Sequence, residues 1–235
     1  MKRLLFAMLF TLFTKPSYAI ENYLIKNDNS DELIIGLLGL GMDYNQMLPF
    51  IKDENVLFLY DYSNLDFEFD FTPYKNIKLF AYSAGVMATS LIQDKLPKNI
   101  SKSVAINGVY KLFDNEKGLN DEILSTMYGL DENNYIEFRK KYLVNSEIEL
   151  EKFNQSPPLR SFDSFFKELD ALIGYDNGKK PKPYVFDKVF ISNNDNTIPF
   201  KNQLKAWEDT KTPYQIIETN HFPFYHFESI KDWFN

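Results

Sequence analysis

Short apolar runs without alternation, separated by helical patterns, are the feature that most constrains the fold of this chain. The expected strands are Leu33–Leu38, Val56–Tyr60, Ile77–Ala81, Ser103–Asn107, Val185–Ser192 and Tyr214–Glu218. Continuously apolar strands suit a parallel sheet covered on both faces, because neither face then meets water. Strands that alternate with helices indicate the same architecture. The sequence therefore predicts an α/β fold with a mostly parallel central sheet flanked by helices.

The expected helices lie unevenly along the chain. One follows the third strand, from about Gly85 to Lys95, whereas residues 120–175 lack strand-like runs and are predicted to be helical. Residues 109–183 therefore form a helical insert between the fourth and fifth strands, and Gly178–Pro183 leads the chain back to the sheet. A chain of 235 residues is long enough for one large domain of this kind, which we place at residues 20–235.

Residues 1–19 have the pattern of a secretory signal peptide. A positively charged start, Met1–Arg3, precedes an apolar stretch at residues 4–14 that is too short to span a membrane. Ser17 and Ala19 supply small residues at positions −3 and −1 of a cleavage site. The pattern predicts export, for example to a periplasm, while an uncleaved N-terminal extension is the alternative.

Charge and composition exclude several kinds of function. The net charge is −7, and because residues 1–19 carry +3, the rest of the chain carries −10, which argues against nonspecific nucleic-acid binding. Without cysteine there can be no disulfide, zinc–thiolate site or cysteine nucleophile, and two histidines argue against a histidine-rich metal site. Nothing indicates a metal, nucleotide or redox cofactor, so none is expected.

The strongest chemical signal is a serine between an apolar strand and a helix. Ala81-Tyr82-Ser83-Ala84-Gly85 has the small-x-Ser-x-Gly form of a nucleophile elbow, in which bulky neighbours would clash at the sharp turn. Ala81 replaces the usual glycine with the next smallest residue. The pattern predicts Ser83 as a nucleophile. The alternative is an ordinary turn in which the serine caps the helix.

An acid and a histidine follow in the order typical of α/β-hydrolases. Asp195 lies in a polar loop after the strand that ends at Ser192, and His221 follows the last strand. Serine needs an imidazole to accept its proton and an acid to orient that imidazole. His226 is the competing base, but it falls in a helical pattern, and Asp187 is the competing acid, but it precedes its strand.

Two backbone N–H groups are needed to stabilise an oxyanion. One is expected from Ala84, directly after the serine, and the other from the loop Gly39–Asp43 after the first apolar strand. Glycines at 39 and 41 allow this loop to turn its amides toward Ser83. A phosphate-binding loop is excluded, because no Lys-Ser/Thr pair or G-x-G-x-x-G pattern follows.

Together these motifs resemble the BioG type of pimeloyl-[acyl-carrier-protein] methyl ester esterase over roughly residues 22–234. The residues that carry the resemblance are Leu33–Asp43, Leu59–Tyr62, Leu65–Phe67, Ala81–Gly85, Ala105–Gly108, Asp195–Pro199, Asn202–Leu204, Ala206-Trp207 and His221–Phe224. The resemblance implies an α/β-hydrolase whose insert, residues 109–183, is a helical lid. It also implies hydrolysis of the methyl ester of pimeloyl-acyl-carrier protein in biotin synthesis.

By the same resemblance Ser83 is the nucleophile, His221 the base and Asp195 the orienting acid, with oxyanion N–H groups on Leu40 and Ala84. One departure is Leu38-Gly39-Leu40-Gly41, where the family usually has Asn-Gly-Trp-Gly. The backbone donors survive this change, but the packing around the acyl entrance must differ.

A carrier-protein substrate is acidic and requires a cationic docking face. The candidates in the insert are Arg139, Lys140, Lys141 and Arg160, with Lys179, Lys180 and Lys182 at its exit. The alternative is that these residues form an ordinary solvated helix face.

Two other functions stay open. A signal peptide conflicts with a cytoplasmic carrier, which leaves an exported serine esterase acting on a free short-chain ester. A noncatalytic binding protein on a hydrolase fold is the second alternative, since a fold does not guarantee a function.

Overall fold

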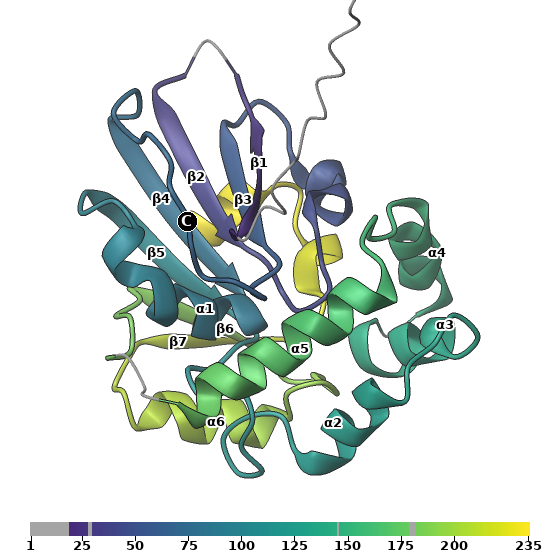
Figure 1. Ribbon diagram of the computed structural model, residues 1–235. Helices are drawn as coiled ribbons and strands as arrows, with labels where there is room; N and C mark the ends of the chain where they lie inside the picture. Colours follow the sequence, from purple (N-terminus) through teal and green to yellow (C-terminus); the bar gives the residue numbers. More distant parts are fainter. Residues whose placement is uncertain (1–18, 28–29, 145, 179–181) are drawn as a thin grey trace, which may run out of the picture.

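The protein is described from a computed structural model that covers residues 19–27, 30–144, 146–178 and 182–235 (Figure 1). The expected signal peptide lies outside the described residues except for Ala19, as do Lys179 and Lys180 of the expected docking cluster. In these ranges, no helix has the length and apolar character needed to cross a membrane.

A seven-stranded sheet with the strand order β1-β3-β2-β4-β5-β6-β7 forms the centre of the molecule. The strands are β1 (Glu21–Ile25), β2 (Glu32–Leu37), β3 (Val56–Tyr60), β4 (Asn76–Tyr82), β5 (Ile100–Ile106), β6 (Lys188–Ser192) and β7 (Tyr214–Ile217). All neighbouring pairs are parallel except β1 and β3, so the predicted mostly parallel sheet is confirmed. The sequence does not predict β1, because this edge strand is largely exposed and lacks an apolar run.

The sheet separates two apolar layers, because successive side chains of a strand point to opposite faces. On β2, Leu33, Ile35 and Leu37 pack on one side, whereas Ile34 packs on the other. The first side is covered by α1 (Ala84–Ile92), α5 (Phe162–Asn177) and α6 (Phe200–Glu208). The second is covered by the 3-10 helices η1 (Tyr44–Phe50) and η5 (Ile230–Phe234) and by α4 (Glu147–Gln155).

The predicted helical insert lies between β5 and β6. It contains α2 (Asp121–Tyr128), α3 (Tyr135–Phe138), the π-helical turn η3 (Arg139–Leu143), α4 and α5. Figure 1 shows α2, α3 and α4 grouped to one side, while α5 runs back across the molecule. Polar side chains begin three of these helices: Asn120, Ser146 and Ser161 each accept a hydrogen bond from a first-turn N–H group.

Several elements differ from the sequence expectation; β5, for example, begins at Ile100 rather than Ser103. Strand β6 begins at Lys188 rather than at Val185, a residue that is 77% exposed. The expected helix after His221 is replaced by two 3-10 helices, η4 (Pro223–His226) and η5. The carboxylate of Asp232 accepts the N–H groups of Glu228 and Ser229, so these groups start a new turn instead of continuing the first one.

Candidate active site

Ser83 occupies a sharp turn between β4 and α1. Its backbone has φ 53° and ψ −122°, a conformation that costs a non-glycine residue about 1–3 kcal/mol. The turn is possible because its neighbours are small: a Cβ on Gly85 would lie 2.2 Å from the Leu37 carbonyl oxygen. A Cβ on Gly108 would lie 2.4 Å from the Ser83 carbonyl oxygen. The strand–turn–helix expected at this position is therefore present, and its strain is held by close backbone contacts.

One chain of hydrogen bonds connects the three residues predicted to act together. The Nε2 atom of His221 lies 3.1 Å from the Oγ atom of Ser83, and its Nδ1 atom lies 2.8 Å from an oxygen of Asp195. All three residues are buried. Ser83 follows β4, Asp195 follows β6 and His221 follows β7, so all three come from the carboxyl ends of parallel strands. The parallel sheet thus brings together residues 138 positions apart.

The carboxylate of Asp195 faces hydrogen-bond donors on every side. Its Oδ1 atom accepts the N–H groups of Thr197 (2.8 Å) and Ile198 (2.9 Å). Its Oδ2 atom accepts the side-chain amide of Gln203 at 2.8 Å in addition to the His221 ring. This arrangement suits an ionised carboxylate, which can only accept. It holds the acid in one orientation against the imidazole.

Asn107, at the end of β5, fixes the backbone around the histidine. Its side-chain NH₂ group donates to the carbonyl oxygens of Asn220 (3.0 Å) and His221 (2.9 Å) and to the Ser192 hydroxyl (2.7 Å). Sequence patterns assign no role to Asn107 or Gln203. The available signals were their places in the motifs Ile106-Asn107-Gly108 and Asn202-Gln203, but neither motif shows which backbone groups the amides contact.

The two N–H groups expected to bind an oxyanion belong to Ala84, the residue after Ser83, and to Leu40, which lines the same cavity as Ser83. Ala84 is the first residue of α1, where an N–H group has no intrahelical acceptor. Among the described residues, the Leu40 N–H group also has no backbone acceptor. The loop after β2 turns at Gly41, which has φ 72°, and the Met42 N–H group donates to the Gly39 carbonyl oxygen at 3.1 Å.

A mostly apolar cavity of about 50 Å³ adjoins Ser83 and His221. Its apolar lining includes Leu40, Met127, Phe138, Leu143, Phe153 and Phe165. Five of these six residues belong to the insert, on α2, α3, η3, α4 and α5, so the insert covers the cavity beside the serine. The ring of Tyr82 packs 5.3 Å from the His221 ring, and burial raises the pKa of Tyr82 well above its ordinary value. Tyr82 therefore stays neutral.

The competing histidine and aspartate lie elsewhere. His226 is exposed, and its Nε2 atom lies 3.0 Å from Glu149. Asp187 precedes β6, at the opposite end of that strand from Asp195, and accepts a hydrogen bond from the Ser103 N–H group at 2.7 Å. Among the described residues, no group of three or more His, Asp or Glu side chains is placed to hold a metal ion.

The expectation that Arg139 belongs to an exposed docking cluster is wrong. Its guanidinium is buried, 4.1 Å from the ring centre of Tyr135 and 5.1 Å from that of Phe153. A planar, weakly hydrated guanidinium stacks well on aromatic rings, which explains why it leaves the surface. Lys140 and Lys141 are exposed, so the surface cations of this segment are lysines.

Arg160 is also buried and unavailable for docking. It contacts Asp61 at 2.9 Å and Glu168 at 2.6 Å, and the exposed fraction of its side chain is 6%. Burial alone would raise the pKa of Asp61, but hydrogen bonds from Ser63 and the charge of Arg160 outweigh it and lower that pKa. For Glu168, burial raises the pKa and the charge of Arg160 opposes the rise. The sequence could not reveal the pairing with Asp61, because Asp61 lies about 100 positions away from Arg160.

Comparison with known proteins agrees with this architecture. The family description that matches residues 21–233 reads "Pimeloyl-ACP methyl esterase BioG". The chain belongs to the BioG family. A crystal structure of BioG from Haemophilus influenzae, 23% identical, superposes with a TM-score of 0.81 over 92% of this chain and 100% of that chain. A lipase-esterase related protein from Clostridium acetobutylicum, 17% identical, gives a TM-score of 0.57 over 87% of this chain and 93% of that chain. These neighbours confirm the α/β-hydrolase fold.

Two relatives in sequence differ in length and description. A malonyl-[acyl-carrier protein] O-methyltransferase from Bacteroides fragilis is 29% identical over 196 residues, which is 81% of this chain but 39% of that protein. This BioG chain thus spans about two fifths of that relative's length. An uncharacterized protein from Haemophilus influenzae is 27% identical over 84% of this chain and 91% of its own length.

Proposed function

We propose that this BioG-family protein is a serine esterase that hydrolyses the methyl ester of pimeloyl-acyl-carrier protein, a step in biotin synthesis. The observation that carries the proposal is the hydrogen-bonded chain from Ser83 through His221 to Asp195, beside an apolar cavity. Serine, imidazole and carboxylate in this order are the parts required for acyl transfer.

In the first half of the reaction, His221 Nε2 accepts the Ser83 proton while Oγ attacks the ester carbonyl carbon. The carbonyl oxygen becomes an oxyanion, which accepts hydrogen bonds from the N–H groups of Leu40 and Ala84. Asp195 holds the imidazole in the required tautomer and stabilises the imidazolium. When the tetrahedral intermediate collapses, the bond to the methoxy oxygen breaks. The leaving oxygen takes the proton from His221 and departs as methanol.

In the second half, water replaces methanol. His221 accepts a proton from the water as its oxygen attacks the acyl-enzyme, and a second oxyanion forms in the same place. Collapse breaks the bond to Ser83 Oγ, which takes the proton back from His221 and releases the free carboxylic acid. In other serine enzymes a single oxyanion donor is worth about 10²–10³-fold in kcat, so both N–H groups are expected to matter.

The carrier-linked substrate has separate support. The family description and the Bacteroides relative's name both refer to an acyl group on acyl-carrier protein. The apolar lining of the cavity suits an alkyl chain rather than a sugar or a charged group. Because both arginines of the insert are buried, carrier docking would depend on the exposed Lys140, Lys141 and Lys182.

Covalent labelling with a fluorophosphonate, together with release of methanol from the methyl ester, tests the esterase. The wild-type protein should label and hydrolyse the ester, and Ser83→Ala should do neither while keeping its circular dichroism spectrum. Ser125→Ala changes an exposed serine of α2 in the same way and should behave like wild type. A folded wild-type protein that neither labels nor releases methanol would support the noncatalytic alternative.

Charge reversal separates the carrier substrate from a small ester. Lys140→Glu with Lys141→Glu should slow hydrolysis of the carrier-linked ester and spare a small soluble ester, which needs no docking. Lys98→Glu with Lys201→Glu makes the same charge change at exposed positions outside residues 109–183 and serves as the control. The wild-type rate on the carrier substrate should also fall with added salt, because exposed charges are screened within about 8–10 Å.

An exported esterase for a free ester is the second candidate, favoured by the signal-like pattern of residues 1–19. Intact mass of the protein purified from its native host would show whether cleavage occurs after Ala19. Rescue of a biotin auxotroph that lacks its own methyl esterase, by the chain with and without residues 1–19, tests the substrate. Cleavage without rescue by either form would favour the free-ester enzyme.

A further inference from the structure

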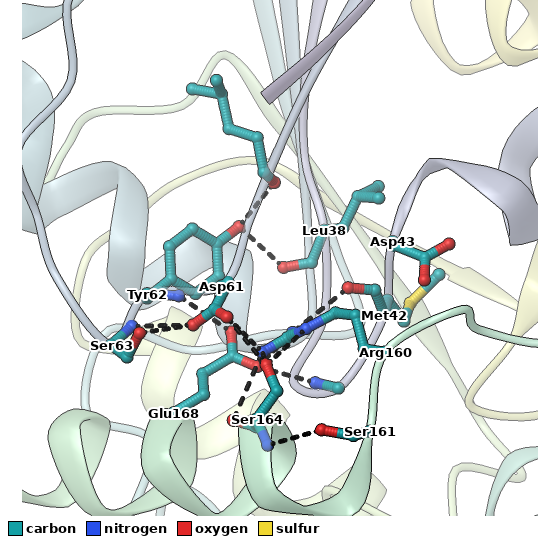
Figure 2. A network of polar contacts seen from close by, with 12 residues as sticks. Leu38, Met42, Asp43, Asp61, Tyr62, Ser63, Arg160, Ser161, Ser164 and Glu168 are labelled. Atoms are coloured by element: carbon teal, nitrogen blue, oxygen red, sulfur yellow. Dashed lines mark hydrogen bonds and ion pairs between the residues drawn. The ribbon is translucent and has the colours of Figure 1, made fainter. Parts of the chain in front are cut away.

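A buried carboxylate joins the insert to the loop that carries the Leu40 N–H group (Figure 2). Glu168 lies on α5 and is fully buried. Its Oε2 atom accepts the Gly41 N–H group at 2.9 Å and an Arg160 N–H group at 2.6 Å. Its Oε1 atom accepts the Tyr62 N–H group at 3.1 Å. All the groups that hold this charge are therefore donors, and one of them belongs to the residue after Leu40.

Arg160 extends the same network to the next residue of the loop. It donates to the carbonyl oxygen of Met42 at 3.3 Å while it pairs with Glu168 and Asp61. The Ser164 hydroxyl donates at 2.8 Å to the same Oδ2 atom of Asp61 that Arg160 contacts, as Figure 2 shows. The loop is thus held at the Gly41 N–H group and at the Met42 carbonyl oxygen by residues of the insert.

Packing reinforces these contacts on the same side of the loop. A Cβ on Gly41 would lie 2.5 Å from the Phe165 ring, so α5 packs directly against the loop backbone. Further along, the Asn45 side chain donates to the Pro157 carbonyl oxygen at 2.7 Å, and the Leu159 N–H group donates to Asp43. Residues 157–168 therefore contact Gly41, Met42, Asp43 and Asn45.

We propose that Glu168 and Arg160 are positioning residues that fix the oxyanion loop, with Glu168 engaging the Gly41 N–H group so that the Leu40 N–H group stays directed toward Ser83. The inference rests on the proposed esterase function. A buried carboxylate is costly, and an apolar residue is often tolerated equally well at such a place, so stability alone gives weak reason to keep one. Its contacts with the loop give a catalytic reason, since oxyanion donors act only when they are held in place before the reaction.

Helix α5 connects this network to the central sheet. Helix α5 carries Glu168, begins just after Arg160 and packs on the sheet through Leu169 and Leu172. In this proposal, this end of the insert supports the oxyanion loop.

Glu168→Gln tests the proposal with little change in shape. Glutamine keeps one acceptor oxygen, but its NH₂ group is a donor. The glutamine side chain therefore cannot accept hydrogen bonds from all three N–H groups that donate to Glu168. On a small soluble ester, kcat should fall about 10- to 100-fold, with KM within about threefold of wild type. The inhibition constant of an alkyl boronic acid, whose Ser83 adduct places an oxygen in the oxyanion site, should rise by a similar factor. Asp163→Asn makes the same carboxylate-to-amide change at an exposed position of α5 and should leave both values unchanged.

Asp61→Asn is the milder second variant, in case Glu168→Gln does not fold. It acts on the far end of the network, at a left-handed backbone position (φ 58°) that asparagine tolerates. It should lower kcat by a smaller factor, again without a matching rise in KM. Hydrogen exchange of the segment 38–47 should be faster in both variants than in wild type.

Two results would overturn the inference, and a third would overturn the function on which it rests. If Glu168→Gln lowers only the melting temperature and leaves kcat and boronate affinity as in wild type, the carboxylate is merely structural. Unchanged exchange of residues 38–47 would show that it does not hold the loop. A wild-type protein that fails to label with fluorophosphonate would refute the esterase function itself, and hydrogen exchange would then still decide whether Glu168 fixes the loop.

Discussion

The Asn107 side chain offers a quantitative test of how the histidine loop is held. In Asn107→Asp, the NH₂ group that donates to the carbonyl oxygens of Asn220 and His221 is replaced by an oxygen. The Ser192 hydroxyl can reverse its role and donate to the new carboxyl, and the Ser192 N–H group keeps its acceptor. Two carbonyl oxygens therefore lose their donor and face a like partial charge in a fully buried site.

The size of the effect follows from these two contacts. A net hydrogen bond contributes about 1 kcal/mol, and a buried group left without a partner costs about 1–3 kcal/mol. The free energy of unfolding should therefore fall by about 2–4 kcal/mol, which for a chain of this length lowers Tm by roughly 10 °C. Displacement of the His221 backbone should also lower kcat about 10-fold or more, since small misplacements of a catalytic group are costly.

The deficit should grow as the pH rises. Burial among carbonyl oxygens raises the pKa of the new carboxyl above that of an ordinary aspartate. Because this carboxyl has a raised pKa in the folded state, the stability that it contributes is present below its unfolded-state pKa and is lost as the pH rises through its folded-state pKa. Below the folded-state pKa, the protonated carboxyl can donate a hydrogen bond to one of the two carbonyl oxygens. The gap between variant and wild type should thus be larger at pH 8 than at pH 5.

Urea unfolding followed by tryptophan fluorescence measures this gap, because Trp207 and Trp233 are both fully buried. Asn99→Asp makes the same substitution at an exposed position and should change the unfolding free energy by less than about 0.5 kcal/mol. A deficit for Asn107→Asp that is equally small, or that is the same at both pH values, would refute the role assigned to the amide.

Three further predictions concern the acid, the elbow and acid stability. Asp195→Asn should lower kcat by about 10⁴-fold in ester hydrolysis, because an amide favours the wrong imidazole tautomer, whereas Asp187→Asn should stay near the wild-type rate. Gly85→Ala should abolish cooperative thermal unfolding, since its Cβ would lie 2.2 Å from a carbonyl oxygen of β2. Gly174→Ala, with nothing within 4 Å, should raise stability by about 0.5–1 kcal/mol. The Lys111 ammonium lowers the pKa of Asp114 to about 2. The stability that the Asp114 carboxylate contributes is therefore present above the ordinary pKa of an aspartate and is lost as the pH falls toward 2. Urea unfolding at pH 7 and pH 3 should show a smaller acid-induced loss for Asp114→Asn than for wild type.

Local physics explains what could be predicted from the sequence. Apolar runs such as Val56–Tyr60 become buried strands because a sheet covered on both faces removes them from water. Six of the seven strands coincide with a predicted run, although the edge strand β7 is largely exposed. The small residues around Ser83 indicate a tight turn by their size alone, because larger side chains would clash there. Because parallel strands end at one edge, the order of Ser83, Asp195 and His221 was enough to place them near one another.

Only the tertiary structure decided the roles of the remaining polar residues. Arg139 and Arg160 look like surface cations in the sequence, but one stacks on aromatic rings and the other pairs with Asp61 and Glu168. Asn107 and Glu168 each meet backbone groups more than 100 positions away. A charged or amide side chain can be satisfied by water as readily as by such distant groups. Its role therefore depends on which backbone groups the folded chain brings to it, and neighbouring residues in the sequence carry no record of that choice.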